Sequence, residues 1–211
     1  MPGFDDSTWV NTNTCGGPGG IIEPADWVPI KVIRTLESKY LGNGIYDFSE
    51  NVSGWVKIKT SGERDTEIQL VYAEQLKKDG SDIDNENINS FTRQQFHTDK
   101  YILKGEGTEE WEPRFVYHGF RYVEVIGLPG EFTAETLTAV VIRNNCRRAG
   151  DFKCSNPLVN DIFKMILHTE ERNIFAVPTD CPQRDERLGW TGDAQIFCKS
   201  AIWNMDCKAF Y

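Results

Sequence analysis

The hydrophobic pattern of the chain changes its period near Arg143, and this change constrains the fold more than any other feature. From about residue 40 to residue 142, apolar and polar residues alternate, which is the pattern of half-buried β-strands. Beyond Arg143, apolar residues recur every three or four positions, as on one face of an α-helix. We therefore expect a β-domain followed by helices, without regular alternation of strands and helices.

The β part holds at least five strand candidates, separated by turns that contain glycine or proline. Their close spacing, without helices between them, favours an antiparallel sandwich of the jelly-roll type over a parallel sheet. The candidates span residues 45–60, 66–76, 96–105, 110–128 and 132–143.

Two further segments flank this β part. The first begins with a glycine-rich stretch and ends in IKVIRTLE, which alternates like a strand. We assign residues 1–38 to the tail of an upstream domain or a linker, residues 39–143 to the β-sandwich and residues 144–211 to a helical domain.

We expect two helices in the last segment. In the first, Asn156 is a suitable N-cap and Pro157 a suitable first helical residue. The second runs from Asp193 to Tyr211. Two helices cover little of each other's apolar surface, so we expect a larger helical domain that is cut short. The apolar face of the first helix consists of Leu158, Ile162, Met165 and Ile166.

The formal net charge of −9 and the isoelectric point near 4.9 bear on the class of partner. Nucleic acids and anionic lipids both attract basic surfaces, so the charge argues against both and leaves neutral partners such as carbohydrates. No apolar stretch reaches the roughly eighteen residues of a membrane-spanning helix. The N-terminus also lacks the basic and apolar regions of a secretory signal, and we expect a cytoplasmic protein.

The six cysteines show no CxxC pair and no Cys/His spacing that suits zinc. Most of them lie in apolar or helical surroundings beyond Arg143. We interpret them mainly as buried free thiols of a reduced protein, and we expect neither a metal nor a cofactor.

The stretch PTDCPQRDERLGWTGDAQ, residues 178–195, combines four carboxylates, two arginines, a tryptophan and a thiol. A loop rich in acids and arginines is commonly an exposed cluster of salt bridges. Here Pro178 and Pro182 stiffen the loop, glycines flank Trp190, and Asp193 lies at a helix start, where an anion is stabilised. Carboxylates accept hydrogen bonds from sugar hydroxyls, and an indole can cover a sugar's C–H face. The stretch is therefore a candidate sugar site.

This stretch, preceded by FKCSNPLVNDIF, resembles the start of the catalytic domain of bacterial α-L-rhamnosidases, glycoside hydrolase family 78. The segments YDFSENVSGWVKIKTSG and EEWEPRFVYHGFRYVEVIGLP resemble the β-sandwich that precedes this domain. The segments DSTWV and PIKVIRTLE resemble the end of a further N-terminal sandwich. The resemblance implies a mixed fold, an antiparallel, jelly-roll-like β-sandwich followed by the first helices of an incomplete (α/α)6 barrel.

The resemblance also implies an activity, hydrolysis of terminal α-L-rhamnosides with inversion, and a role for each matching residue. The general acid is then Glu186, which protonates the leaving oxygen. The substrate-binding residues are Asp180 and Asp193, which hold the sugar hydroxyls, Arg184 or Arg187, which orients them, and Trp190, which faces the 6-methyl group.

Acid catalysis makes two demands on this chain. The pKa of Glu186 must be raised by burial and by neighbouring anions, whereas an arginine that points inward has the opposite effect. An inverting enzyme also needs a second carboxylate at roughly 6.5–9.5 Å from the acid. The resemblance assigns that base to a later helix, so we expect this chain alone to lack it and to be inactive.

Two other functions remain open. One is a non-catalytic β-sandwich module that binds carbohydrate or scaffolds a partner, and the other is a six-hairpin glycosidase with a different sugar specificity. Several aromatic residues could form a sugar platform on the sandwich, although core packing is the favoured interpretation, and His118 is interpreted as a hydrogen-bonded strand residue. These aromatic residues are Trp55, Trp111, Phe115, Phe120 and Tyr122.

Overall fold

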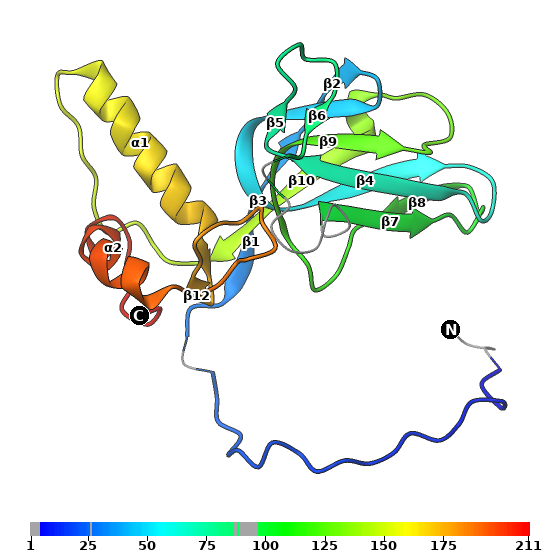
Figure 1. The fold of residues 1–211 in the computed structure, drawn as a ribbon, viewed down its shortest axis with the longest axis horizontal. Helices are drawn as coiled ribbons and strands as arrows, with labels where there is room; N and C mark the ends of the chain where they lie inside the picture. Colours follow the sequence, from blue (N-terminus) through cyan, green and yellow to red (C-terminus); the bar gives the residue numbers. More distant parts are fainter. Residues whose placement is uncertain (1–4, 26, 87, 89–96) are drawn as a thin grey trace.

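The structure is a computed structural model that describes residues 5–25, 27–86, 88 and 97–211. A β-domain and a helical part lie next to each other, as the sequence pattern predicts (Figure 1). Before Ile30, the described residues have no regular strand or helix and run away from the body of the molecule (Figure 1). Phe96, at the start of the third strand candidate, lies outside the described residues.

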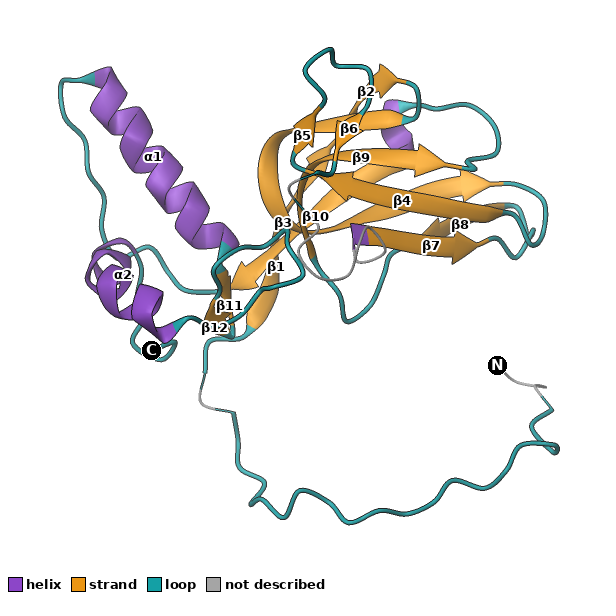
Figure 2. Cartoon of the chain, in the orientation of Figure 1, coloured by secondary structure: helices purple, strands orange, loops and turns teal. Residues whose placement is uncertain are grey.

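The described residues of the β-domain form an eight-stranded sheet in which the paired strands are antiparallel (Figure 2). The order is β1-β10-β3-β9-β4-β7, with β2 and β8 also paired to β3. Strands β5 and β6 form a separate two-stranded sheet. The strands are β1 (Ile30–Glu37), β2 (Lys39–Gly42), β3 (Ile45–Ser61), β4 (Glu67–Ala73), β5 (Gln75–Leu76), β6 (Ile83–Asp84), β7 (Thr98–Ile102), β8 (Thr108–Trp111), β9 (His118–Ile126) and β10 (Leu137–Asn144). A 3₁₀ turn, η2 (Ala134–Thr136), precedes β10.

Strand β3 is long enough to belong to two groups of strands. Its first half pairs with β2 and β9, and its second half pairs with β10 and β8. The change of partners occurs around Gly54, where a Cβ atom would lie 1.9 Å from the carbonyl oxygen of Val140. Only glycine permits this close approach, so the sequence element SGW is what lets one strand serve both groups.

One core fills the space that these strands enclose. In β4, Ile68, Leu70 and Tyr72 are all fully buried, as their alternation with polar residues predicts. The aromatic rings of Phe48 and Phe120 meet edge to face at 5.6 Å. The buried members of this core are Tyr46, Phe48, Val52, Val56, Ile58, Ile68, Leu70, Tyr72, Leu103, Phe120, Val123, Val125, Leu137 and Ala139.

The sequence interpretation of the aromatic residues is right for Phe120 and wrong for Phe115. Phe120 is fully buried, whereas the Phe115 side chain is completely exposed. Trp55, Trp111 and Tyr122 are intermediate and pack at the margins of the apolar clusters. Strand periodicity therefore fails at Phe115, which lies between β8 and β9 rather than in a strand.

Strand β1 extends the sheet into the segment that the sequence analysis assigns to an upstream domain or linker. It pairs with β10 from Ile30, opposite Asn144, to Glu37, opposite Thr138. Ile30 and Val32 are exposed, at 45% and 56%. The strand therefore joins the sandwich through backbone hydrogen bonds and buries few of its own side chains.

The helical part contains α1 (Pro157–Arg172), β11 (Ile174–Phe175), β12 (Val177–Pro178) and α2 (Thr191–Asn204). The predicted N-cap is confirmed, because the Asn156 side chain accepts a hydrogen bond from the Leu158 backbone N–H. The prediction that the second helix reaches Tyr211 is wrong. It ends at Asn204, because Met205 is extended and forms a bridge with Arg148. No helix among the described residues is long and apolar enough to cross a membrane.

The two helices meet at a small interface rather than in a large core. A cluster of Cys146, Ile174, Ala201, Met205 and Cys207 is buried where α2, β11 and the last residues of the chain meet. The Asn204 amide also donates a 2.7 Å hydrogen bond to the buried carboxyl of Glu170. By contrast, the predicted apolar face of α1 is open, with Leu158 65% and Met165 61% exposed.

All six cysteines are free. Cys146, Cys181 and Cys207 are buried, whereas Cys15 is exposed and Cys154 and Cys198 are intermediate. Burial raises the pKa of Cys207 to about 12. The interpretation of the cysteines as mainly buried free thiols therefore holds for half of them.

Candidate active-site loop

The acid-rich stretch forms a loop between β12 and α2, as its prolines predict. Thr179 and Gly189 form an isolated antiparallel bridge that closes the loop. Next to it, the Leu188 backbone N–H donates to Asp180 Oδ1 at 3.0 Å, and the Asp180 N–H donates to the Leu188 carbonyl at 3.3 Å. The two ends of the loop, Thr179–Asp180 and Leu188–Gly189, are thus joined by hydrogen bonds, and we call this closing point the neck of the loop. Asp180 is part of the neck.

Arg184 brings two of the predicted site carboxylates together. Its Nη2 atom lies 3.4 Å from Asp180 Oδ2 and 3.4 Å from Glu186 Oε2. The Asp180 side chain is 12% exposed and the Glu186 side chain 23% exposed. The Cys181 thiol, which accepts from Arg184 Nε at 3.4 Å, is the main cause that raises the pKa of Arg184, and Glu186 and Asp180 add to it.

The same three acidic groups are the described residues that could hold a metal ion. Donor atoms of Asp180, Cys181 and Glu186 all lie within 4.8 Å of one another. The Arg184 guanidinium already contacts each of these three side chains. The positive charge next to these three side chains is therefore that of Arg184, and their donor atoms are arranged around its guanidinium group.

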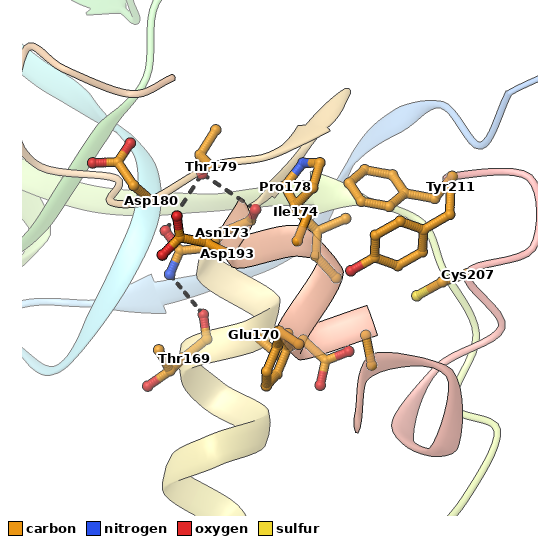
Figure 3. A pocket seen from close by; sticks show the side chains of 14 residues that line it. Thr169, Glu170, Asn173, Ile174, Pro178, Thr179, Asp180, Asp193, Cys207 and Tyr211 are labelled. Atoms are coloured by element: carbon orange, nitrogen blue, oxygen red, sulfur yellow. Dashed lines mark hydrogen bonds between the residues drawn. The ribbon is translucent and has the colours of Figure 1, made fainter. Parts of the chain in front are cut away.

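A pocket of about 210 Å³ lies between the loop, the end of α1 and the start of α2. Asp180 and Asp193 both line it, and they lie near Asn173, at the opposite end from Cys207 and Tyr211 (Figure 3). Arg184, Glu186 and Trp190 are not among its lining residues. The structure therefore groups the predicted site residues into two pairs. Asp180 is joined to Glu186 through Arg184, and Asp180 and Asp193 lie at the same end of the pocket.

Trp190 and Asp193 mark the start of α2. Trp190 occupies the N-cap position with its side chain 45% exposed, and Asp193 lies in the first turn. A carboxylate in the first turn is stabilised by the free backbone N–H groups there. The exposed indole is available to a ligand, although it does not line the pocket.

Several pocket residues are not identified by the sequence motif. The Thr179 hydroxyl donates to the Asn173 carbonyl at 3.2 Å, and the Asn173 amide donates to the Thr169 carbonyl at 2.9 Å (Figure 3). Burial raises the pKa of the Glu170 carboxyl and raises the pKa of Tyr211 to about 12. Polar residues at the end of a predicted helix, just before the motif, are the signal that points to Thr169 and Asn173.

Two family models match the chain. The bacterial alpha-L-rhamnosidase concanavalin-like domain matches residues 38–143, and the bacterial alpha-L-rhamnosidase 6 hairpin glycosidase domain matches residues 147–211. The first match covers the strands from β2 to β10, and the second covers the helices and the acid-rich loop.

Similar proteins carry the same family name. An alpha-L-rhamnosidase of Streptomyces avermitilis is 36% identical over 99% of this chain and 20% of its own length. The structure of an alpha-L-rhamnosidase from Dictyoglumus thermophilum is 42% identical with a TM-score of 0.89, over 100% of this chain and 24% of that one. The Streptomyces avermitilis alpha-L-rhamnosidase complexed with L-rhamnose is 35% identical with a TM-score of 0.84, over 99% and 20%.

The chain thus spans about a fifth to a quarter of the length of these relatives. The family models together cover most of the described β-strands and both helices. On these matches, the chain belongs to the bacterial alpha-L-rhamnosidase family.

Proposed function

We propose that this chain supplies the acid half of the active site of an inverting α-L-rhamnosidase. In this proposal, Glu186 is the general acid that protonates the leaving oxygen of a terminal α-L-rhamnoside. Asp180 and Asp193 hold the sugar hydroxyls, and Trp190 covers the apolar 6-methyl group. The observation that carries the proposal is the convergence of Asp180, Arg184 and Glu186 beside a pocket that Asp180 and Asp193 line.

The contacts support different roles for the two acids Asp180 and Glu186. Asp180 is tied into the neck of the loop by Leu188 and is the more buried acid, which suits a residue that holds substrate. The Glu186 side chain is more exposed, and its ion-pair partner among the described residues is Arg184. We propose that a bound sugar replaces this contact, so that Arg184 orients the sugar and Glu186 is released for proton transfer.

The general base, in this proposal, lies outside the chain. Inversion requires a second carboxylate at roughly 6.5–9.5 Å from the acid, with a water molecule between it and the sugar. We infer that further helices complete an (α/α)6 barrel around the pocket and bring this base. The open apolar face of α1, where Leu158, Ile162, Met165 and Ile166 are each at least 41% exposed, supports this inference.

The test compares two substrates in a polypeptide that joins this chain to the remainder of the catalytic domain. Glu186→Gln keeps the size of the side chain but removes the proton. We expect the turnover of an alkyl rhamnoside, whose leaving group needs protonation, to fall by about 10²–10⁴-fold. The turnover of p-nitrophenyl α-L-rhamnoside, whose leaving group departs as an anion, should fall much less. NMR of the first-formed anomer measures inversion.

The matched control is Glu131→Gln, because Glu131 is an exposed glutamate remote in sequence from the loop. It should leave both turnover numbers unchanged. Near-normal hydrolysis of the alkyl rhamnoside by Glu186→Gln contradicts the acid assignment. Preference for a glucoside or fucoside over the rhamnoside points instead to a six-hairpin glycosidase of different specificity.

One observation favours a second function, a carbohydrate-binding β-sandwich. Trp55, Trp111 and Phe115 line a groove together with charged residues that include Lys57 and Glu110. Phe115 is fully exposed and has a φ of 61°, a conformation that bulky residues rarely adopt. If this chain binds an oligosaccharide and loses affinity in Phe115→Ser but not in Asp180→Asn, the sandwich function is favoured.

A further inference from the structure

We propose that Arg187 is a positioning residue, which holds the backbone next to Glu186 against the β-sandwich and so aims the acid. This inference rests on the proposed function of Glu186, and it gives the β-sandwich a part in aiming that acid. The arginine follows Glu186 directly in the sequence, so its anchoring acts on Glu186 through the shared peptide.

The Arg187 side chain contacts the sandwich at Tyr117. Its Nη1 atom donates a hydrogen bond to the backbone carbonyl of Tyr117, and its guanidinium lies 4.4 Å from the centre of the Tyr117 ring. The same ring stacks on Phe175 of β11, with centroids 4.2 Å apart and planes 6° from parallel. Tyr117 therefore binds both the residue after Glu186 and the strand that leads into the loop.

The backbone of Arg187 needs such an anchor. Its φ of 34° lies in the left-handed region, which residues with a Cβ adopt at a cost in energy. Conformations of this kind persist where the surrounding contacts determine them. The hydrogen bond and the stacked guanidinium are the contacts that determine it here.

A second contact fixes the other arm of the loop on β9, two residues beyond Tyr117. At Gly119 of β9, a Cβ atom would lie 2.7 Å from Pro182 Cγ and 2.8 Å from the backbone nitrogen of Gln183. Glycine at this position therefore lets the loop backbone approach the strand closely. Glu186 lies between two fixed points, Pro182 at Gly119 and Arg187 at Tyr117.

The surface under the loop is itself rigid. His118 Nε2 lies 3.1 Å from both carboxylate oxygens of Asp99, and its ring stacks on Tyr72 at 4.0 Å. The Tyr72 hydroxyl donates to Asp99 at 2.7 Å. His97, 5.0 Å from the His118 ring, also interacts with the backbone of Gln183 in the loop. A buried, hydrogen-bonded cluster of this kind holds few alternative positions.

The two arginines of the motif thus have different tasks. Arg184 contacts the reacting carboxyl, whereas Arg187 contacts the sandwich. A residue that positions the acid should affect the protonation of the leaving group more than the binding of the sugar. This difference separates positioning from a general loss of structure.

The experiment uses Arg187→Met in the polypeptide that joins this chain to the remainder of the catalytic domain. We expect kcat for an alkyl rhamnoside to fall at least ~10-fold, and at most as far as it falls in Glu186→Gln. For p-nitrophenyl α-L-rhamnoside, kcat should fall less than ~3-fold, because the leaving group of this substrate needs no proton from the acid. The KM values for both substrates should change little. Arg187→Lys should be intermediate, since it keeps the charge and loses the planar stack.

Arg121→Met is the matched control. Arg121 also lies over a tyrosine of the sandwich, 5.0 Å from the centre of the Tyr122 ring, and pairs with Asp47, but it does not contact the loop. It should leave the ratio of the two kcat values unchanged. In this chain alone, hydrogen exchange of residues 180–189 should be faster in Arg187→Met than in Arg121→Met, which remains measurable if either variant has low activity.

Three results decide the matter. An equal loss of kcat on both substrates, or unchanged kinetics and unchanged exchange, overturns the positioning role of Arg187. If Glu186→Gln shows the substrate-dependent loss and Arg187→Met does not, the acid assignment stands and the positioning role is wrong. If Glu186→Gln itself shows no substrate-dependent loss, the proposed acid fails, whatever Arg187→Met does.

Discussion

The β-sandwich and the helical part of this chain differ in how completely each buries its apolar residues. The sandwich encloses a core of fourteen buried residues, six of which are completely inaccessible in β3 and β4 alone. The helical part has a cluster of five buried residues and leaves Met165, Ile196 and Trp203 more than 60% exposed. Both parts carry large apolar side chains, so the difference lies in how these side chains are packed.

From this difference we expect the sandwich to be stable by itself and the helical part to depend on its neighbours. A closed core contributes to the free energy of unfolding in proportion to the apolar area it removes from water. Helices without such a core depend on tertiary contacts that are supplied from elsewhere. The acid loop lies on the border of the two parts, which explains why it is tied to the sandwich by Arg187 and Gly119.

The largest expected effect on stability is that of Phe120→Ala. Phe120 is fully buried and meets Phe48 and Tyr72 edge to face. Its removal should lower the free energy of unfolding by about 3–5 kcal/mol, measured by urea denaturation followed by circular dichroism. Phe197→Ala is the counterpart in the helical part, where Phe197 is only partly buried. An equal loss in both variants would contradict the contrast between the two parts.

A smaller effect should appear as a pH dependence that originates in the sandwich. Burial, and to a lesser extent His118 and Arg187, lowers the pKa of His97 well below its usual 6.5. As the pH falls below 6.5, the unfolded chain gains a proton that the folded chain does not. This contribution to stability is therefore fully present above pH 6.5 and is progressively lost as the pH falls below it.

His97→Gln tests this dependence by removing the titrating group. The variant should be less stable at pH 7.5, yet the change in its unfolding free energy between pH 7.5 and 5.5 should be smaller than in the wild type. His168→Gln, on α1, is the control and should retain the wild-type slope. If the unfolding free energy still depends on pH in His97→Gln but no longer does so in His168→Gln, the pH dependence originates in the helical part instead.

The smallest effect is expected for Met165→Ala on the open face of α1. Met165 is 61% exposed, so its truncation should change the unfolding free energy of this chain by less than ~0.5 kcal/mol. In a polypeptide that carries the remaining helices, the same change should cost about 2 kcal/mol or more, because the side chain is then buried. Equal effects in both lengths would argue that nothing covers this face.

The sequence predicts those parts of the fold in which burial leaves a local pattern. The alternation of Ile68, Leu70 and Tyr72 identifies β4 because every second residue enters the core. The N-cap at Asn156 is also predictable from the local sequence, because its hydrogen bond with Leu158 spans only two residues. Such features need no knowledge of the rest of the molecule.

Other parts of the fold depend on distant residues and are missed. The alternation of IKVIRTLE predicts the strand β1 but not its place in this sheet, which is set by β10, about a hundred residues later, while the residues of β1 are almost all exposed. The end of α2 at Asn204 is fixed by the bridge between Met205 and Arg148. Neither partner can be identified from the local sequence.

The candidate site divides in the same way. The resemblance assigns Asp180, Glu186 and either Arg184 or Arg187 to one site, and the structure brings Asp180, Arg184 and Glu186 together. The sequence does not distinguish Arg184 from Arg187, because the partner of Arg187 is Tyr117, seventy residues earlier. The roles of these residues in catalysis stay predictions that the substitutions above can test.

The course of β3 has a consequence for how the family can vary. Because this strand is hydrogen-bonded to β2, β8, β9 and β10, an inserted residue would invert the facing of its side chains against several partners at once. Turns between other strands can lengthen at little entropic cost. We therefore expect natural variants and designed chimeras to differ in loop length, while the part of β3 from Val52 to Ser61, where the pairing is regular, admits neither insertion nor deletion.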